Sequence, residues 1–307
     1  MSHSSSGILK PCYLFAPGNL LRRLWLAIRP VRNGIRVVSL LWGGQLEVDL
    51  ADSVGREIFT QRIFDISVSE CAGRLINPGD HVVDAGANIG YMSTLFAAMV
   101  GKSGRVDSFE PHPKIRQKLE ANLSRNAGRR GGTGNVTVHS CALGEQSGEA
   151  NLVETEYFAF NQGTAKLAIG APGEESKPGV IRHPVQVETL DDLFPSAEIS
   201  LLKIDVEGHE LQVIRGARRL LKEKRIRHVI YEDHAEGNSG LPETFASHGY
   251  TVFSIGRTLR GLELRVPGER IALDTSWESP SYLATSLPDQ VRSRIGKGWK
   301  ILSPLRG

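Results

Sequence analysis

The chain has 307 residues, of which 40% are hydrophobic and 23% are charged, enough to build one large globular domain with additions. Its formal net charge of +3 is close to neutral for this length, which argues against a dedicated nucleic-acid-binding protein. The three cysteines, Cys12, Cys71 and Cys141, form no CxxC pair, so they predict neither a disulfide framework nor a zinc site and favour a reducing cytoplasm.

The first 76 residues are predicted to form an extension that packs on the main domain. An apolar run over 20–28 contains Arg22 and Arg23, and it is too short and too charged to span a bilayer. We expect a helix that packs on the body of the protein; the alternative is a peripheral contact with an anionic membrane surface. Two short strands within 35–50, around the turn at Gly43, and a helix over 67–76 complete the extension.

Strands and helices then alternate regularly over 77–275, which we take as the main domain. The expected strands are 82–83, 105–109, 136–140, 200–204, 228–231 and 251–255, and the expected helices are 92–100, 114–126 and 210–222. This order predicts an α/β fold with a mostly parallel sheet and helices on both faces. A hairpin of 262–266 with 270–273 would add antiparallel strands at the C-terminal end.

Two segments do not fit the alternation. The polar, Gly- and Pro-rich segment 156–184 is predicted to be a lid or insert that selects the substrate, because loops of this length in compact domains are usually functional. The segment 276–307 is predicted to be a basic tail exposed to solvent, with docking of an acidic partner as the alternative.

The segment HVVDAGANIG, residues 81–90, predicts a strand that turns through glycines into a helix. Gly86 and Gly90 allow unusual dihedral angles and a close approach of the backbone to a ligand, and Asn88 tolerates a left-handed conformation. Asp84 would hold the amino group of a bound amino acid. The order D-x-G-x-N-x-G differs from the dinucleotide fingerprint G-x-G-x-x-G, and a pyrophosphate would fit poorly beside Asp84.

A second acidic residue follows at the end of the next predicted strand. Glu110 lies 20 residues after Gly90, the spacing and placement by which an acidic side chain binds both hydroxyls of a ribose. The alternative is a charge at a helix N-terminus, because Pro111 and Pro113 indicate that a helix begins there.

Four motifs occur in the order VVDAGANIGYMS, FEPHP, CALGEQSGEANL and LLKIDVEGHELQVIRGA, and the chain over Trp42 to Ile255 resembles the FkbM family of methyltransferases. The resemblance implies a Rossmann-like class I methyltransferase fold and S-adenosylmethionine as the methyl donor. It implies that the donor is bound by Asp84, Ala85, Gly86, Asn88, Gly90, Glu110, Pro111, Cys141, Ala142 and Asp205. The implied acceptor is a hydroxyl of a sugar, glycan, glycolipid, polyketide or other small secondary metabolite.

The chemistry of O-methylation requires that the acceptor be aligned with the methyl group and that its proton be removed. Polar residues follow the strands 200–204 and 228–231, and their carboxyl ends should face one crevice. The candidate catalytic residues are Asp205, Glu207, His209, Glu232 and His234. Either histidine is a natural general base, because an imidazole titrates near neutral pH.

Other interpretations of these two polar clusters remain open. Asp205 with Glu232 or Asp233 could hold Mg²⁺, which would polarise an acceptor hydroxyl. Lys203 and Asp205 could instead form a local ion pair, and Glu210 fits a helix N-terminus better than a catalytic role.

Two sequence features that are absent narrow the class of acceptor molecule. No [DN]-P-P-[YF] motif, which suits amino groups, follows the strand 200–204, and no basic stripe interleaved with aromatic residues predicts a nucleic-acid partner. The alternative functions are an NAD(P)-dependent oxidoreductase on a similar sheet and a non-catalytic, methyltransferase-like binding module.

Overall fold

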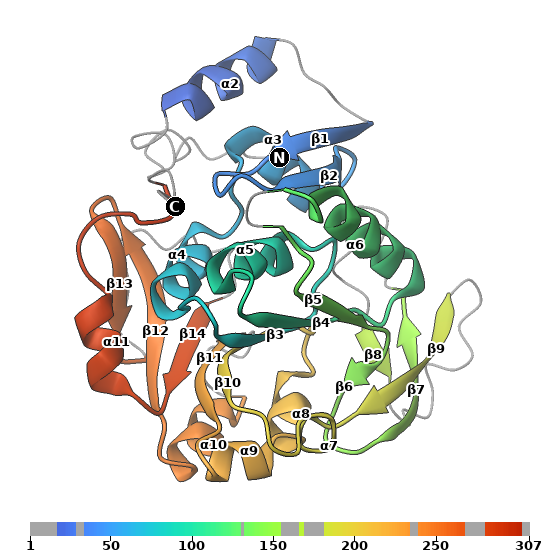
Figure 1. The fold of residues 1–307 in the computed structure, drawn as a ribbon, viewed down its shortest axis with the longest axis vertical. Coiled ribbons are helices and arrows are strands. Elements are labelled where there is room, and N and C mark those ends of the chain that lie inside the picture. The colour runs from blue at the N-terminus through green and yellow to red at the C-terminus, as the bar shows by residue number, and fades with distance from the viewer. Residues whose placement is uncertain are drawn as a thin grey trace.

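The computed structural model describes residues 17–28, 34–129, 132–154, 166–168, 181–233, 239–267 and 280–302. Its central sheet contains the strands β3 (His81–Ala85), β4 (Arg105–Phe109), β5 (Val136–His139), β10 (Ile199–Ile204), β11 (Ile226–Glu232), β12 (Thr251–Thr258), β13 (Gly261–Arg265) and β14 (Ser281–Thr285). They are arranged in the order β13-β12-β14-β11-β10-β3-β4-β5 (Figure 1). The five strands from β11 to β5 pair in parallel, and the other three pair antiparallel. The predicted fold class is therefore confirmed.

Helices cover both faces of this sheet. The helices of the main domain are α4 (Ile66–Leu75), α5 (Tyr91–Val100), α6 (Pro113–Asn126), α7 (Leu190–Leu193), α8 (Glu210–Arg215), α9 (Arg218–Lys222), α10 (Leu241–Ser247) and α11 (Pro288–Arg294). The sequence interpretation assigned α4 to the N-terminal extension, but it packs in the main core with α5 and α11. Val82 and Leu201 join a core with α4, α5 and α11, whereas Val83 and Leu202 join a second core with α8, α9 and α10. Adjacent residues of a strand point to opposite faces, so each strand contributes to both cores.

The predicted helix 210–222 is broken into α8 and α9 at Gly216. Gly216 packs directly on the backbone of Gly144, and only glycine fits there, because a Cβ would lie 2.0 Å from the carbonyl oxygen of Gly144. The Gly216 carbonyl also accepts a hydrogen bond from the backbone of Asp191 rather than from a continuing helix. A contact between segments far apart in the chain thus decides this local structure.

The N-terminal part consists of α2 (Pro17–Ile28), β1 (Ile35–Ser39), β2 (Gln45–Asp49) and α3 (Ser53–Gln61). β1 and β2 pair antiparallel around the predicted turn. Asn122 and Asn126 of α6 hydrogen-bond the backbone of Glu47 and Gln45, which fixes the hairpin on the main domain. The sequence interpretation missed α3, although Asp52 is a recognisable N-cap whose carboxylate accepts from the Gly55 N–H at 2.8 Å.

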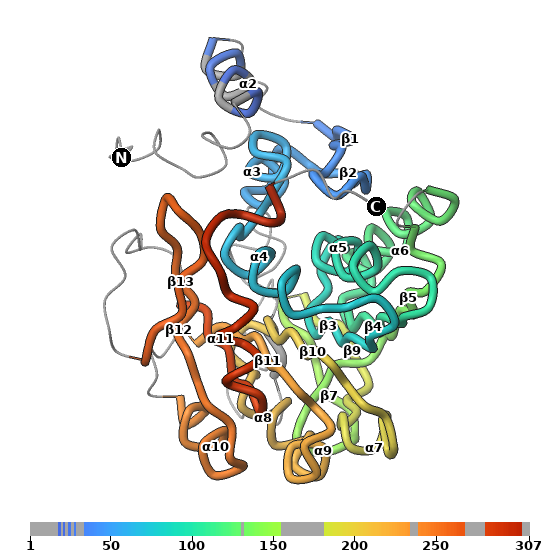
Figure 2. Tube along the Cα trace, turned by 60° about the vertical axis from the view of Figure 1, so that its left-hand side comes forward, coloured from blue at the N-terminus to red at the C-terminus, as the bar shows by residue number. Residues whose placement is uncertain are grey.

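α2 lies beyond α3, at the end of the molecule farthest from α9 and α10 (Figures 1 and 2). Its exposed apolar side chains are Leu21, Leu24, Trp25 and Ile28. Positions spaced by three and four residues share one face of a helix, so α2 presents an apolar stripe to solvent. As expected, the helix also contacts the body: Asn19 is buried against α3, where its side chain donates to the Gln61 carbonyl at 2.7 Å. Among the described residues, no helix is both long enough and apolar enough to cross a membrane.

A small second sheet contains β6 (Ala142–Leu143), β7 (Gly148–Val153), β8 (Lys166–Ala168) and β9 (Arg182–Glu188), in the order β6-β9-β7-β8. β7 and β9 pair antiparallel and flank the predicted insert. Of that insert, 156–184, the described residues are 166–168 and 181–184, and the remainder lies outside the described part of the chain. The sequence interpretation did not anticipate this sheet.

The C-terminal segment differs from the exposed basic tail that the sequence predicts. β14 lies between β11 and β12 inside the central sheet, and Trp299 and Ile301 are buried. The buried carboxylate of Glu70 accepts hydrogen bonds from the backbone of Lys300 and Ile301, at 2.8 and 2.7 Å. In the expected hairpin, β13 pairs with β12, and the partner strand predicted at 270–273 lies outside the described residues. The described part of this segment, 280–302, therefore contributes to the core of the domain.

Candidate functional site

The loop between β3 and α5 has the left-handed backbone that its glycines predict. Gly86, Asn88 and Gly90 have φ angles of 80°, 49° and 93°. A Cβ on Gly86 would lie 1.8 Å from the carbonyl oxygen of Asp205, so only glycine fits where the ends of β3 and β10 meet. The Asn88 side chain accepts a hydrogen bond from the Ile89 N–H at 2.7 Å, which stabilises the turn.

Asp84 is fully buried beneath this loop. Its Oδ2 accepts a hydrogen bond from the Ser93 hydroxyl at 2.6 Å, and its Oδ1 lies 3.8 Å from the Lys203 ammonium. Burial raises the pKa of Asp84. The sequence interpretation has this carboxylate hold an amino group of the ligand, whereas the structure directs it onto Ser93 and Lys203.

Lys203 lies between the buried Asp84 and the partly exposed Asp205. Its ammonium lies 3.1 Å from Oδ2 of Asp205 and donates to the Gly86 carbonyl at 3.3 Å. Burial would lower the pKa of Lys203, but attraction to Asp205 and Asp84 outweighs it and raises that pKa, which keeps the lysine charged. The expected pairing of Lys203 with Asp205 is confirmed, and Asp205 remains 36% exposed.

Glu110 contacts the same loop from the end of β4. Its two carboxylate oxygens accept from the backbone N–H groups of Asn88, at 3.0 Å, and His112, at 2.9 Å. Burial raises the pKa of Glu110 to about 7, although these hydrogen bonds act in the opposite direction. The two segments predicted to bind the cofactor therefore meet in space.

The remaining candidates for cofactor binding lie near these segments. Ala85 ends β3 and Pro111 follows Glu110. Ala142 is buried at the start of β6, and Cys141 is half-buried against the second core. Burial raises the pKa of the Cys141 thiol, so it behaves as a small apolar side chain at neutral pH.

Acidic side chains gather at the carboxyl ends of β10 and β11. Glu232 ends β11, and burial followed by repulsion from Asp205, Asp65 and Glu207 raises its pKa to about 9. The sequence interpretation did not include Asp65, which has a φ of 39° and caps α4 by accepting from the Val68 N–H. An aspartate before an apolar run indicates a helix cap, so no local pattern predicts that Asp65 lies near Glu232.

The other catalytic candidates lie in different environments. Glu207 occupies a left-handed position, with a φ of 55°, in the turn before α8. His209 precedes α8, its buried Nε2 has no hydrogen-bond partner among the described residues, and burial lowers its pKa. Glu210 accepts from the backbone of Val206 and Gly208, which is the helix-terminal role expected for it. His234 lies outside the described residues.

The arrangement at this edge gives no support to the Mg²⁺ site considered from the sequence. Asp205 pairs with the Lys203 ammonium, and Oδ2 of Asp233 accepts a hydrogen bond from Ser239 at 2.7 Å. Within the described ranges, three ligand atoms of the metal-binding residue types converge elsewhere, at His112, Glu154 and His183.

Comparisons with known proteins extend the resemblance. The family model described as the methyltransferase FkbM domain matches residues 84–252. The 31-O-demethyl-FK506 methyltransferase FkbM of Streptomyces tacrolimicus is 32% identical over 232 residues, which cover 64% of this chain and 80% of that protein. Methyltransferase sdnD of Sordaria araneosa is 30% identical over 192 residues, covering 54% of this chain and 68% of that protein. The hexuronic acid methyltransferase AglP of Haloferax volcanii is 29% identical over 161 residues, covering 51% and 56%.

Proposed function

Because the chain belongs to the FkbM family of methyltransferases, we propose that it moves the methyl group of S-adenosylmethionine to a hydroxyl oxygen of a small molecule or glycan. The observation that carries this proposal is the contact between the Gly86–Gly90 loop and Glu110. A glycine-bearing turn supports the backbone approach to a ligand, and an acidic residue at the end of the next strand supports ribose binding.

The described residues suit an adenosyl ligand with an amino-acid tail. Each Glu110 oxygen accepts one backbone hydrogen bond, which leaves a second lone pair for a ribose hydroxyl. Cys141 and Ala142 provide small apolar contacts for adenine. The partly exposed carboxylate of Asp205 replaces Asp84 as the partner of the ligand's ammonium, because Asp84 is buried. When bound, the cofactor would supply an electrophilic methyl group near Asp205.

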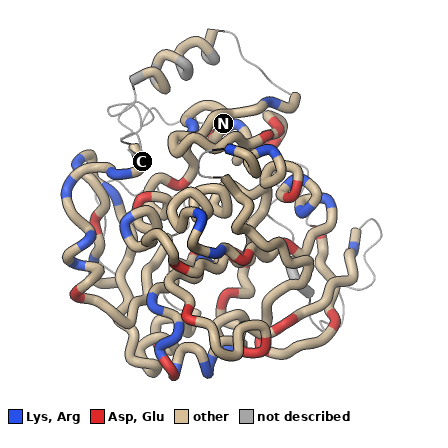
Figure 3. The backbone as a smooth tube through the Cα atoms, in the orientation of Figure 1, with Lys and Arg blue, Asp and Glu red and all other residues tan. Residues whose placement is uncertain are grey.

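Names of relatives support a hydroxyl-bearing acceptor. One matched relative is named for a 31-O-demethyl substrate and another for hexuronic acid. We therefore propose a sugar, glycolipid or polyketide-like hydroxyl. Lys and Arg are interspersed with Asp and Glu along the described chain (Figure 3), which supports the expectation that nucleic acid is not the partner.

We propose Glu232 as the general base that takes the acceptor proton, in preference to His209 or His234. A base must give up its own proton first, and the raised pKa of Glu232 makes it a strong base once it is ionised. Asp205 and Glu207 surround it and keep its proton affinity high.

The specificity constant kcat/KM, which reports the pKa values of the free enzyme, should therefore depend on pH in a defined direction. It should rise about tenfold per pH unit below the pKa of Glu232, about 9, and level off above it. Glu232→Gln should lower turnover at least about 100-fold and remove this dependence, with KM for the methyl donor little changed. A pH–rate profile of both proteins tests this, and an unchanged profile in Glu232→Gln would exclude the residue as the base.

The same raised pKa affects stability. Folding favours the protonated form of Glu232, so its contribution to stability is complete below the ordinary pKa of about 4.5, is lost progressively as the pH rises from there through about 9, and changes no further above that. Melting temperatures recorded at each pH therefore separate a fall in activity at high pH that comes from unfolding from the fall at low pH that comes from protonation of Glu232.

The acceptor molecule can be identified directly by labelling. Incubating a lysate or glycolipid extract with the protein and methyl-labelled S-adenosylmethionine, followed by mass spectrometry, should yield a product with one added labelled methyl group on oxygen. Labelling on nitrogen or carbon would reject O-methylation while preserving methyl transfer.

We also propose that α2 contacts an anionic membrane surface. Its exposed apolar stripe, together with the neighbouring arginines of 22–36, suits insertion at a charged lipid interface. Trp25→Glu should abolish co-flotation with vesicles that contain phosphatidylserine, whereas Val266→Glu, at another exposed apolar residue, should not. Equal flotation of Trp25→Glu and the unchanged protein would contradict the contact.

A further inference from the structure

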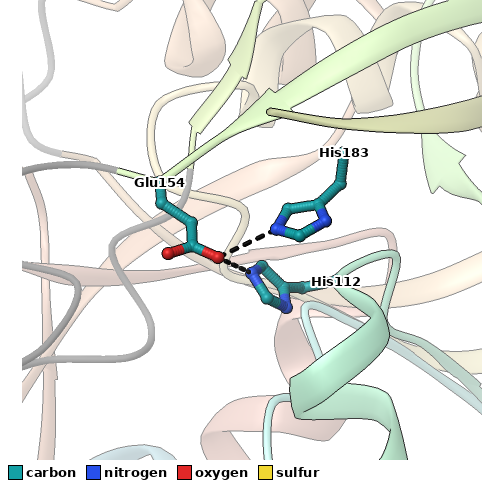
Figure 4. Close-up of side chains that lie close together, drawn as sticks. All are labelled: His112, Glu154 and His183. Carbon is teal, nitrogen blue, oxygen red and sulfur yellow. Dashed lines mark hydrogen bonds and ion pairs between the residues drawn. The ribbon is translucent and has the colours of Figure 1, made fainter. Parts of the chain in front are cut away.

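Three side chains from distant parts of the sequence converge near the Gly86–Gly90 loop, the candidate cofactor loop. Nε2 of His183 lies 2.8 Å from Oε1 of Glu154, and Nε2 of His112 lies 3.3 Å from the same oxygen (Figure 4). The three ligand atoms all lie within 4.8 Å of one another. None of these residues belongs to the site proposed for methyl transfer.

The backbone holds each of the three residues in place. His112 precedes α6, and its N–H donates to Glu110. Glu154 follows β7, where its N–H donates to the carbonyl of Ile181, and His183 lies in β9 opposite Leu152. The cluster therefore joins the end of β4 to the two strands that flank the segment 155–180.

The cluster is largely shielded from water. The side chains of His112, Glu154 and His183 are 2%, 11% and 17% exposed. Lys114, which is 62% exposed, brings its ammonium to 3.4 Å from the same Oε1. Three nitrogen atoms thus converge on one carboxylate oxygen, which has only two lone pairs to offer. A single cation placed among the two imidazoles and the carboxylate would satisfy all three ligands at once.

The donor set and the spacing both suit a first-row divalent ion. Two imidazole nitrogens and one carboxylate oxygen form the three-residue set that binds zinc with a fourth position open. In a tetrahedral zinc site with bonds of about 2.0 to 2.1 Å, ligand atoms lie about 3.3 Å apart. The two Nε2–Oε1 distances, 2.8 and 3.3 Å, lie close to this value, and the two imidazole nitrogens lie within 4.8 Å of each other, so side-chain rotations that bring them together would complete the geometry.

We propose that His112, Glu154 and His183 form a zinc site, with Nε2, Oε1 and Nε2 as ligands and the Lys114 ammonium displaced when the ion binds. The ion ties β7 and β9 to the residue that follows the Glu110–Pro111 pair. Its first effect is therefore structural: it stabilises the base of the segment 155–180 against the candidate cofactor loop. This site is independent of the identity of the methyl acceptor.

The test uses the full chain, freed of metal by chelation and dialysis at about pH 8, where imidazoles are neutral. Adding zinc chloride should give one bound zinc per chain by equilibrium dialysis with elemental analysis, and it should raise the melting temperature. Mg²⁺ should produce neither effect, because it prefers oxygen ligands. Absence of saturable zinc binding, or an unchanged melting temperature at saturation, would overturn the proposal.

Variants distinguish this site from adventitious binding. His183→Ala and the nearly isosteric Glu154→Gln should each weaken zinc binding more than about 100-fold, beyond the range seen for outer-shell partners. His183→Ala could weaken zinc binding by disturbing the fold, whereas Glu154→Gln preserves the shape of the side chain and tests the ligand alone. Circular dichroism shows whether each variant is folded.

The chain offers a matched control at Asp107. That carboxylate also accepts from two histidines, His81 and His139, but the Arg105 guanidinium lies 2.6 Å from its Oδ2 and occupies the position of a cation. His139→Ala should leave zinc binding unchanged. Zinc binding that survives in His183→Ala and Glu154→Gln, or that is lost equally in His139→Ala, would place the ion elsewhere.

Discussion

Lys203→Met is expected to lower the free energy of unfolding by about 3 to 5 kcal/mol, the usual effect of removing one partner from a buried ion pair. The methionine preserves much of the side-chain volume but removes the ammonium that lies between Asp84 and Asp205. Asp84 is fully buried and would keep only its hydrogen bond from Ser93. The carbonyl of Gly86 would also lose a donor, which should loosen the candidate cofactor loop.

Urea unfolding measures this change in free energy. Two further variants show whether it comes from the buried ion pair. Arg218→Met removes an exposed ion pair, 2.9 Å from Glu145, and should cost less than about 1 kcal/mol. The double variant Lys203→Met with Asp84→Asn should recover part of the loss, because no buried carboxylate then lacks its opposite charge. If Lys203→Met costs no more than Arg218→Met, the buried network does not organise the site.

Gly86→Ala is expected to abolish cofactor binding as well as to destabilise the fold. A Cβ at this position would lie 1.8 Å from the carbonyl oxygen of Asp205, and the φ of +80° disfavours any residue with a side chain. The N–H of Asp205 donates to Ala85 at 3.0 Å, so β10 cannot move away without breaking its pairing with β3. We expect a loss of more than about 3 kcal/mol in stability and at least about 100-fold in affinity for S-adenosylhomocysteine.

Gly43→Ala separates backbone strain from the clash. Gly43 has a φ of +93° in the turn between β1 and β2, but a Cβ there meets nothing within 4 Å. This control should cost about 1 kcal/mol and leave cofactor affinity unchanged. Calorimetric titration of both variants is the measurement, and equal behaviour of the two would show that the close approach of β3 and β10 does not shape the pocket.

Local patterns predicted the parts of the fold that local forces determine. The strand over 105–109 and the hairpin around Gly43 follow from apolar runs bounded by turn residues, and both occur as expected. The contact between Glu110 and Asn88 was also foreseeable, because parallel strands place their carboxyl ends together.

Features that depend on distant segments were not predicted. Nothing in the sequence near 281–285 indicates that this strand inserts between β11 and β12, and the break at Gly216 depends on the backbone of Gly144. The buried charge of Asp84 is likewise balanced by Lys203, which lies on another strand. His112, Glu154 and His183 are separated by 42 and 29 residues, so only the folded chain brings them together.

The binding of S-adenosylhomocysteine tests the central claim most directly. Calorimetry should give one site per chain, with an affinity that Glu110→Ala lowers at least about tenfold, or about 1.4 kcal/mol, while the exposed Glu198→Ala has no effect. A parallel titration with NAD should show no saturable binding. Saturable binding of NAD with none of S-adenosylhomocysteine, or an affinity unchanged in Glu110→Ala, would contradict the account of this crevice.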